Sequence, residues 1–224
     1  SITSTTATST NDIYYNTIAI SGSGGATTFG SSGIYHAASA TATTATLNLR
    51  NNIIANTCTA SGLGIAVAFR RSGTNLENYA STSNNNLFYG GVLMYNGTNS
   101  YTTIGALKTV MSNRDQNSIT ENPTFQSTTG SSVDFLKFDL TVPTQIESGA
   151  VNISTYTTDY AGTIRYGNAS STSTGTAPDL GAWELDGTVA VAMSYTSSTT
   201  VQLTGNAYAN QNNQAIIRVK IVTT

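Results

Sequence analysis

The segment NNIIANT at residues 51–57 decides the fold, because similar segments stand on either side of it, NDIYYNT at 11–17 and NNLFYGG at 85–91. Each is an asparagine-containing turn that leads into an apolar strand. A second series interleaves with the first and places a glycine just before a β-rich stretch: SGIYHAA at 32–38, LGIAVAF at 63–69 and GGVLMYN at 90–96. The pattern recurs at a spacing of roughly 30 to 40 residues, which is typical of repeat proteins.

We therefore predict an all-β protein built as a parallel β-helix, a solenoid whose repeats stack their short strands on one another. The turn asparagines are expected to form hydrogen-bonded ladders. Inward-facing residues should meet their equivalents in neighbouring repeats. This predicts two apolar columns, one of Ile13, Ile53 and Leu87 and one of Ile34, Ile65 and Val92. A β-sandwich is the alternative fold, but it gives no reason for a repeat.

The pattern changes after Tyr101. Ile104, Leu107 and Met111 have the spacing of one helix face and predict a short helix ending near Ser112, although Gly105 inside the pattern leaves a loop as the alternative. Two short alternating runs then predict a return to strand, Val133 with Phe135 and Phe138 with Leu140. We expect the solenoid to close between there and residue 187.

Residues 188–224 are predicted to be a separate small unit after a turn at Asp186-Gly187. Three stretches in it alternate like strands: TVAVAMSYTS, TTVQLTG and QAIIRVKIVTT. Three strands rarely bury a core unaided. We expect either that this chain is part of a longer one or that a neighbouring chain completes the unit.

Composition excludes several classes of function. Only 9% of the 224 residues are charged and the net charge is −2, so no basic field exists that would gather nucleic acid. The longest apolar stretch, residues 63–69, is too short for a membrane-spanning helix, so we expect no membrane insertion. The single cysteine, Cys58, excludes an internal disulfide, and the single histidine, His36, excludes a multi-histidine metal site. No cofactor is predicted.

Over residues 10 to 186 the sequence resembles the right-handed parallel β-helix repeats, pectate-lyase-like, of large secreted and surface proteins of Bacteroidetes-type bacteria. The resemblance rests on the order of five motifs: LNLRNNIIANT at 47–57, STSNNNLFY at 81–89, ENPTF at 121–125, DFLKFDLTVPTQIESGA at 134–150 and APDLGAWEL at 177–185. The last of them is similar to the closing motif of that family. The tail is similar to the first strands of a β-sandwich that follows such solenoids. The resemblance implies an extracellular or cell-surface location.

A β-helix can carry an enzyme or an inert spacer, so activity has to be argued from a site. A uronate lyase needs a cation against the substrate carboxylate, and the candidates are Arg50, Arg70 and Arg71. Arg70 and Arg71 end an apolar strand, where one of them could contact a glycan. Two solvated charges at a strand end are the simpler interpretation, because no acid, base or metal cluster surrounds them in the sequence.

Other reactive residues give weaker signals. Glycoside hydrolysis needs two facing carboxylates, and the closest acids, Asp179, Glu184 and Asp186, lie in or beside the closing motif, where structural hydrogen bonding is expected. His36 and Cys58 lack partner motifs. Trp183 could stack on a sugar, but a single tryptophan in a closing motif is more often part of a core. We identify no catalytic, cofactor or metal residues.

The leading hypothesis is a non-enzymatic structural or adhesive segment of an extracellular surface protein. Its partners would be neighbouring domains, copies of the same chain or a surface polysaccharide. One alternative is a filament subunit that assembles through open terminal strands. The other is a polysaccharide lyase or hydrolase using Arg70 and Arg71.

Overall fold

The computed structural model describes residues 1–25, 27–190, 195–202 and 217–223, and the chain divides into two compact units, Ser1–Ala190 and Val191–Thr224. In the second unit, β10 (Tyr195–Gln202) pairs antiparallel with β11 (Ile217–Thr223). Strand β10 is continuous, although the sequence predicted two separate strands, TVAVAMSYTS and TTVQLTG, in this part of the chain. Residues 191–194 and 203–205 of those predicted strands lie outside the described residues.

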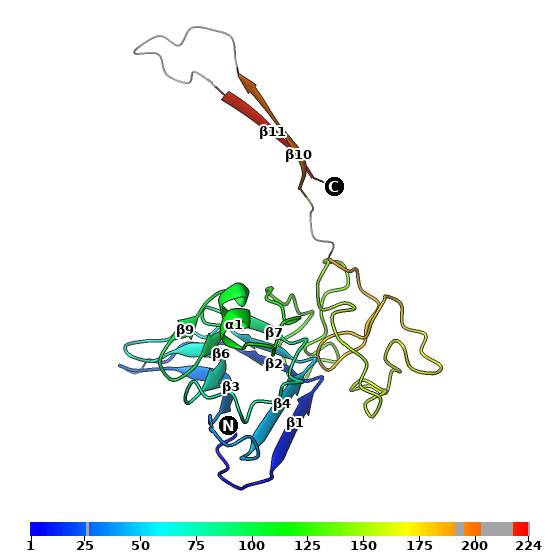
Figure 1. Ribbon diagram of the computed structural model, residues 1–224. Helices are drawn as coiled ribbons and strands as arrows, with labels where there is room; N and C mark the ends of the chain where they lie inside the picture. Colours follow the sequence, from blue (N-terminus) through cyan, green and yellow to red (C-terminus); the bar gives the residue numbers. More distant parts are fainter. Residues whose placement is uncertain (26, 191–194, 203–216, 224) are drawn as a thin grey trace, which may run out of the picture. The chain divides into compact units, whose positions relative to one another are not determined.

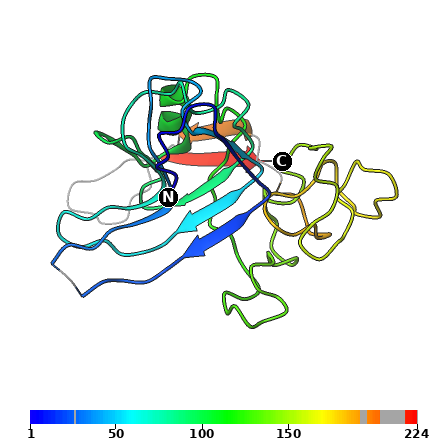
Figure 2. The same ribbon diagram turned by 90° about the horizontal axis from the view of Figure 1, so that it is seen from below.

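The first unit is mostly strand, as predicted for an all-β protein, with one short helix among its described residues. Three pairs of parallel strands form the first two repeats. Strand β1 (Thr10–Tyr14) pairs with β4 (Thr46–Arg50), and β2 (Thr17–Ile20) pairs with β5 (Ile53–Asn56). Strand β3 (Ser31–His36) pairs with β6 (Ala66–Arg71). Strands β7 (Leu87–Gly90) and β8 (Met94–Tyr95) continue two of these sheets, and β9 (Ser100–Tyr101) adds antiparallel to β8. Figures 1 and 2 show the parallel strands side by side.

Strand β5, the central strand of sheet β2-β5-β7, is buried on both faces. Ile54 and Phe88 face one apolar cluster, which also contains Leu49 and Phe69, whereas Ile53 and Leu87 face a second cluster, which includes Ile146 and Leu180. A strand covered on both faces has no reason to alternate apolar and polar residues. This explains why the decisive NNIIANT segment is continuously apolar at its centre.

The predicted asparagine ladder is confirmed, and it lies in the turns between consecutive strands. The backbone N–H of Asn16 donates to Oδ1 of Asn52 over 2.9 Å, and that of Asn52 donates to Oδ1 of Asn86 over 3.1 Å. The Asn86 N–H in turn donates to Oγ of Ser118. The steps of 36 and 34 residues between asparagines fall within the predicted repeat spacing.

The predicted apolar columns are only partly correct. Ile53 does pair with Leu87, but its partner in β2 is Thr17, while Ile13 pairs with Leu49 in a different sheet. The asparagine turn separates β1 from β2 and β4 from β5. The segment NDIYYNT lies mostly before that turn, whereas NNIIANT lies mostly after it.

The second predicted column is wrong, because Ile34 pairs with Phe69 and Phe69 with Met94. The glycines do not occupy equivalent positions. Gly33 lies inside β3, where a Cβ atom would come within 2.5 Å of Cγ2 of Ile54, whereas Gly64 precedes β6.

The predicted helix is confirmed as α1 (Ile104–Val110), beside β9 in Figure 1. Thr103 caps it by accepting a hydrogen bond from the N–H of Ala106. Leu107 and Met111 are buried, as the spacing predicted.

The predicted strands at 133–140 are wrong. Residues 122–190 run along one side of the sheets with turns and isolated bridges in place of strands (Figures 1 and 2). Side chains of Ser132 and Asp139 accept hydrogen bonds from the backbone two residues on and fold the chain into tight turns. We call residues 144–186 the closing segment.

Candidate functional site

The closing segment is held against the turns of the parallel sheets by a column of three residues, each the residue just before a ladder asparagine. Tyr15, Asn51 and Asn85 all have positive φ values, 55°, 61° and 54°, so their side chains point away from the ladder. Asn51 exchanges two hydrogen bonds with the backbone of Val151, over 2.7 and 3.1 Å. The Tyr15 hydroxyl donates to the same carbonyl, and Asn85 donates to that of Gly149.

Gly181 brings the closing motif into direct contact with the sheet. Its N–H donates to the carbonyl of Asn51 over 2.8 Å. Its φ is 84°, and a Cβ atom there would come within 2.4 Å of Oγ1 of Thr17 and 2.7 Å of Cδ1 of Ile53. Any other residue here would be strained at this φ and would displace the side chains of Thr17 and Ile53.

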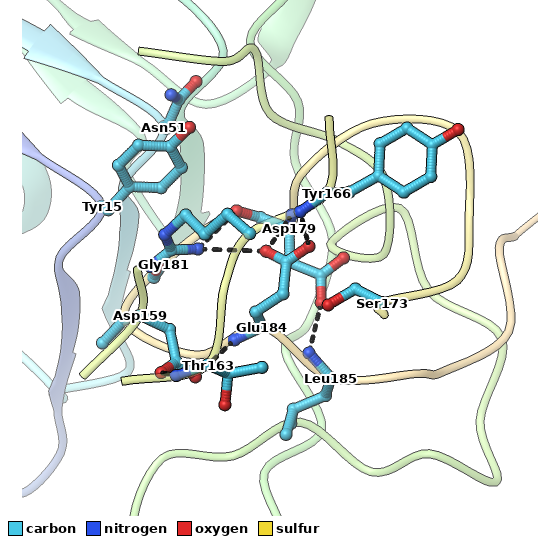
Figure 3. Close-up of polar contacts among 12 residues, drawn as sticks. Tyr15, Asn51, Asp159, Thr163, Tyr166, Ser173, Asp179, Gly181, Glu184 and Leu185 are labelled. Carbon is cyan, nitrogen blue, oxygen red and sulfur yellow. Dashed lines mark hydrogen bonds and ion pairs between the residues drawn. The ribbon is translucent and has the colours of Figure 1, made fainter. Parts of the chain in front are cut away.

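Gly181 also contacts a buried cluster of charged residues (Figure 3). The guanidinium of Arg165 lies 3.9 Å from the ring centroid of Tyr15 and donates to Oε2 of Glu184 over 3.3 Å. It also donates to the carbonyls of Thr158, Asp179 and Gly181. The cation therefore connects Tyr15, in the turn between β1 and β2, to Asp179 and Glu184 of the closing motif APDLGAWEL.

Three carboxylates of this cluster accept hydrogen bonds from backbone N–H groups. Asp179 accepts from Ser148 over 2.9 Å and from Leu185 over 2.8 Å. Glu184 accepts from Tyr166 and Asp179, and Asp159 accepts from Ala161, Thr163 and Glu184. Both oxygens of each carboxylate have a protein partner, so these groups fix loops in place.

Burial shifts the acid–base properties of the cluster. It raises the pKa of Asp179 to about 8, and the nearby carboxylates of Glu147 and Glu184 add to this shift. Burial likewise raises the pKa of Glu147 and lowers that of Arg165. Strongly shifted pKa values are common at functional sites, but they also arise in structural ion clusters.

Access decides between these two interpretations. Asp179 is 1% exposed, Arg165 2% and Glu184 4%, and their polar atoms already bond to the protein. A reacting substrate has to reach the acid and the base directly or through one water molecule. The cluster thus has the properties of a structural clamp, in agreement with the hydrogen-bonding role expected for Asp179 and Glu184. Asp186 lies outside it, exposed, and accepts from Thr174.

The two arginines predicted as glycan contacts lie in different environments. Arg70 is half-buried with its guanidinium 5.0 Å from the ring centroid of Tyr95. Arg71 is 0% exposed, so it does not reach a ligand at the surface. Strand alternation separates the two side chains, and only Arg70 remains accessible. Arg50, the third candidate, lies 5.9 Å over the ring of Tyr14.

Arg71 and His36 form a second buried polar cluster. Nη1 of Arg71 donates to Nδ1 of His36 over 2.5 Å, which leaves the proton of the neutral imidazole on Nε2, where it donates to the carbonyl of Ala45 over 2.9 Å. Nη2 of Arg71 donates to Oδ1 of Asn78. Burial lowers the pKa of His36 to about 4, and the positive charge of Arg71 contributes to this shift. His36 is thus a neutral, packed residue.

The remaining candidates are Cys58 and Trp183. Cys58 is half-buried beside a cavity of about 370 Å³ next to β6. Trp183 is half-buried, donates from Nε1 to the carbonyl of Phe135, and lines a cavity of about 460 Å³. It is therefore at the surface of the molecule, not inside a core.

Sequence reasoning missed Arg165, Asp159 and Tyr160. Asp159 and Gly162 had a readable signal, because an aspartate followed by a glycine three residues later favours a turn, and Oδ1 of Asp159 does accept from Ala161 and Thr163. Arg165 had none, since its partners come from the first turn and from the closing motif.

Within the residues that the structure describes, no group of three His, Cys, Asp or Glu side chains is placed to hold a metal ion, and no helix is long and apolar enough to cross a membrane. Comparison of the chain with protein-family models, with curated proteins and with solved structures finds no match.

Proposed function

We propose that the first unit is a right-handed parallel β-helix that serves as a non-enzymatic structural or adhesive segment of an extracellular or cell-surface protein. The observation that carries this proposal is the ladder of Asn16, Asn52, Asn86 and Ser118, which links equivalent turns of successive repeats. Repeats joined in this way give a stiff body, because each repeat is fixed by its neighbours.

The distribution of charge supports a structural role. Two sets of buried ionisable groups, Arg165 with its three carboxylates and Arg71 with His36, make hydrogen bonds to the protein itself. They hold the closing segment and the sheets in one arrangement. The surface carries few charges, and Ser, Thr and Asn provide its polarity.

The test of the non-enzymatic role is a degradation assay on the full chain. Purified protein is incubated with neutral and acidic polysaccharides, and reducing ends and unsaturated uronates are measured. We expect no product above the buffer control. Product that disappears in Arg70→Ala, but persists in the variant Arg114→Ala, which removes another half-buried arginine, would contradict the proposal and support a lyase.

The location is tested separately on cells that produce the protein natively. An antibody to the chain should label intact cells, and external protease should remove the signal. Labelling that appears only after the cells are lysed would contradict a surface location.

A second candidate function is a filament subunit, favoured by the strands at one edge of the sheets. Among the described residues, β1 and β2 pair on one side only, whereas the outer edge of β3 bonds to Ile2 through Tyr35 and Ala37. An unpaired edge can accept a strand of another molecule. Electron microscopy of concentrated protein tests this: fibres support the filament, and monomers at all concentrations contradict it.

A further inference from the structure

A surface groove in the first unit consists of two adjoining cavities. The larger measures about 460 Å³, and the six lining residues that matter here are Thr17, Ser131, Ser132, Val133, Tyr160 and Trp183. The smaller measures about 320 Å³, and both cavities contact Phe135 and Leu136. Both volumes lie in the range of small-molecule sites. None of the buried charged groups described above lines either of them.

An aromatic corner dominates the larger cavity. Tyr160 is 81% exposed, and its ring lies edge-on to that of Trp183 at 5.3 Å between centroids. The backbone N–H of Tyr160 donates to the carbonyl of Ala182, and Nε1 of Trp183 donates to that of Phe135. Val133 beside them is 82% exposed. Exposed aromatic rings next to other apolar side chains are typical of binding surfaces, since each offers a large apolar face to a ligand.

Hydroxyl groups line the same cavity with protons to donate. Oγ1 of Thr17 accepts from the N–H of Ala182, and Oγ of Ser132 accepts from that of Asp134. In the part of the chain that the structure describes, neither hydroxyl donates to a protein acceptor. A purely hydrocarbon ligand would cover these groups and leave them without partners, which is unfavourable.

The groove carries no uncompensated charge. Lys137 and Asp134 at its rim form an ion pair with each other at 3.1 Å, and Nζ of Lys137 also lies 4.9 Å from the ring centroid of Trp183. A charged ligand would lose hydration without gaining a counter-charge. The lining therefore favours a neutral molecule with one apolar face and several hydroxyl groups.

We infer that this groove binds a neutral oligosaccharide. One sugar ring stacks on Tyr160 and accepts hydrogen bonds from Thr17 and Ser132. The smaller cavity holds a further part of the chain over the row formed by Ala19, Ala55 and Tyr89, which are register partners in β2, β5 and β7. This inference rests on the proposed function only in that the ligand is bound and not cleaved.

The single tryptophan of the chain makes the test direct, because Trp183 lines the larger cavity. The full chain is titrated with neutral oligosaccharides of glucose, mannose, xylose and galactose while tryptophan fluorescence is recorded. Oligogalacturonates and oligoalginates serve as acidic probes. We expect at least one neutral oligosaccharide to shift the emission saturably and the acidic probes to bind at least tenfold more weakly.

Variants place the binding in the groove. Tyr160→Ala and Val133→Asp should each weaken binding at least tenfold without changing the thermal midpoint, because both side chains are exposed. Tyr156→Ala is the matched control: this exposed tyrosine packs on Tyr14 outside the groove, and binding should stay within twofold of the wild-type value.

Three outcomes would overturn the inference. The first is a lack of any fluorescence response to neutral oligosaccharides, and the second is unchanged binding by Tyr160→Ala. The third is a wild-type dimer that Tyr160→Ala converts to monomer, which would assign the aromatic corner to self-association. Release of reducing ends from a bound oligosaccharide would instead contradict the proposed non-enzymatic function.

Discussion

The side-chain amide of Asn52 donates to Oδ1 of Asn86 over 3.0 Å, and the backbone N–H of Asn52 donates to the same oxygen over 3.1 Å. The amide of Asn52 also reaches the carbonyl of Ile13 over 2.8 Å. A single side chain thus links three successive turns in the interior, where each of its polar atoms has a partner. A buried amide ladder of this kind fixes the register of the sheets on both sides of the turn.

Asn52→Ala is expected to lower the free energy of unfolding by about 2–4 kcal/mol, because it leaves buried partners without hydrogen bonds. The control is Asn113→Ala, at an exposed position outside the ladder, which should change stability by less than about 0.5 kcal/mol. Urea denaturation followed by circular dichroism measures both. Equal effects of the two substitutions would show that the ladder does not contribute to the stability of the protein.

Asn85 tests the left-handed turn, because its φ is 54°. Asn85→Gly keeps a residue that adopts this conformation readily, whereas Asn85→Ala does not, and both lose the hydrogen bond to Gly149. The alanine variant should therefore be less stable than the glycine variant by about 1 kcal/mol. Thermal unfolding of the two proteins side by side gives the difference, and a more stable alanine variant would show that the turn has another conformation.

Arg165→Met should destabilise the protein by about 3–5 kcal/mol, since it leaves buried carboxylates without their cation. The loss should grow as the pH rises, because the carboxylates then carry more charge. Arg70→Met, which removes a half-buried cation from the surface, is the control and should have a much smaller effect. Chemical denaturation at pH 5 and pH 8 measures the effect, and a loss that is the same at both pH values would contradict this electrostatic account.

His36 should make stability depend on pH on the acid side. Its pKa is lowered from 6.5 to about 4 in the fold, so between these values the unfolded chain binds a proton that the folded chain does not. Stability from this residue is present above pH 6.5 and is lost as the pH falls toward 4, by at most about 3 kcal/mol.

The comparison of wild type with His36→Gln isolates this contribution. Asp179, whose raised pKa makes stability fall as the pH rises between about 4 and 8, is present in both proteins and cancels. The difference in the free energy of unfolding between the two proteins should therefore shrink from pH 7 to pH 4.5. A difference that stays constant over this range would mean that the pKa of His36 is the same in the folded and the unfolded chain.

The sequence was sufficient for the features that depend on local pattern. The asparagine turns, the β-rich repeats and the helix around Leu107 follow from spacing and residue type, and the structure confirms them. The pairing register of the strands was harder to predict from the sequence. Gly33 and Gly64 each precede an isoleucine in the sequence, but Gly33 lies within β3, where Ile54 packs directly against its backbone, whereas Gly64 precedes β6.

The turns of residues 122–190 and the burial of individual side chains could not be predicted, because long-range partners determine them. The alternation of Val133 with Phe135 suggested a strand, yet Val133 is exposed beside the aromatic corner and the local backbone bonds form turns. Arg71 and Arg70 are adjacent in sequence, and only the strand pairing shows which of them is buried. Arg165 packs on the ring of Tyr15, which is far from it in the sequence.

The most direct test of the parallel repeat is nuclear magnetic resonance spectroscopy of the full chain in solution. The account predicts cross-strand nuclear Overhauser contacts that join the backbone of Ile53 to those of both Thr17 and Leu87, together with slow exchange of the side-chain amide protons of Asn52 and Asn86. Contacts from Ile53 to Ile13, antiparallel pairing of these segments, or rapid exchange of both amides would contradict it.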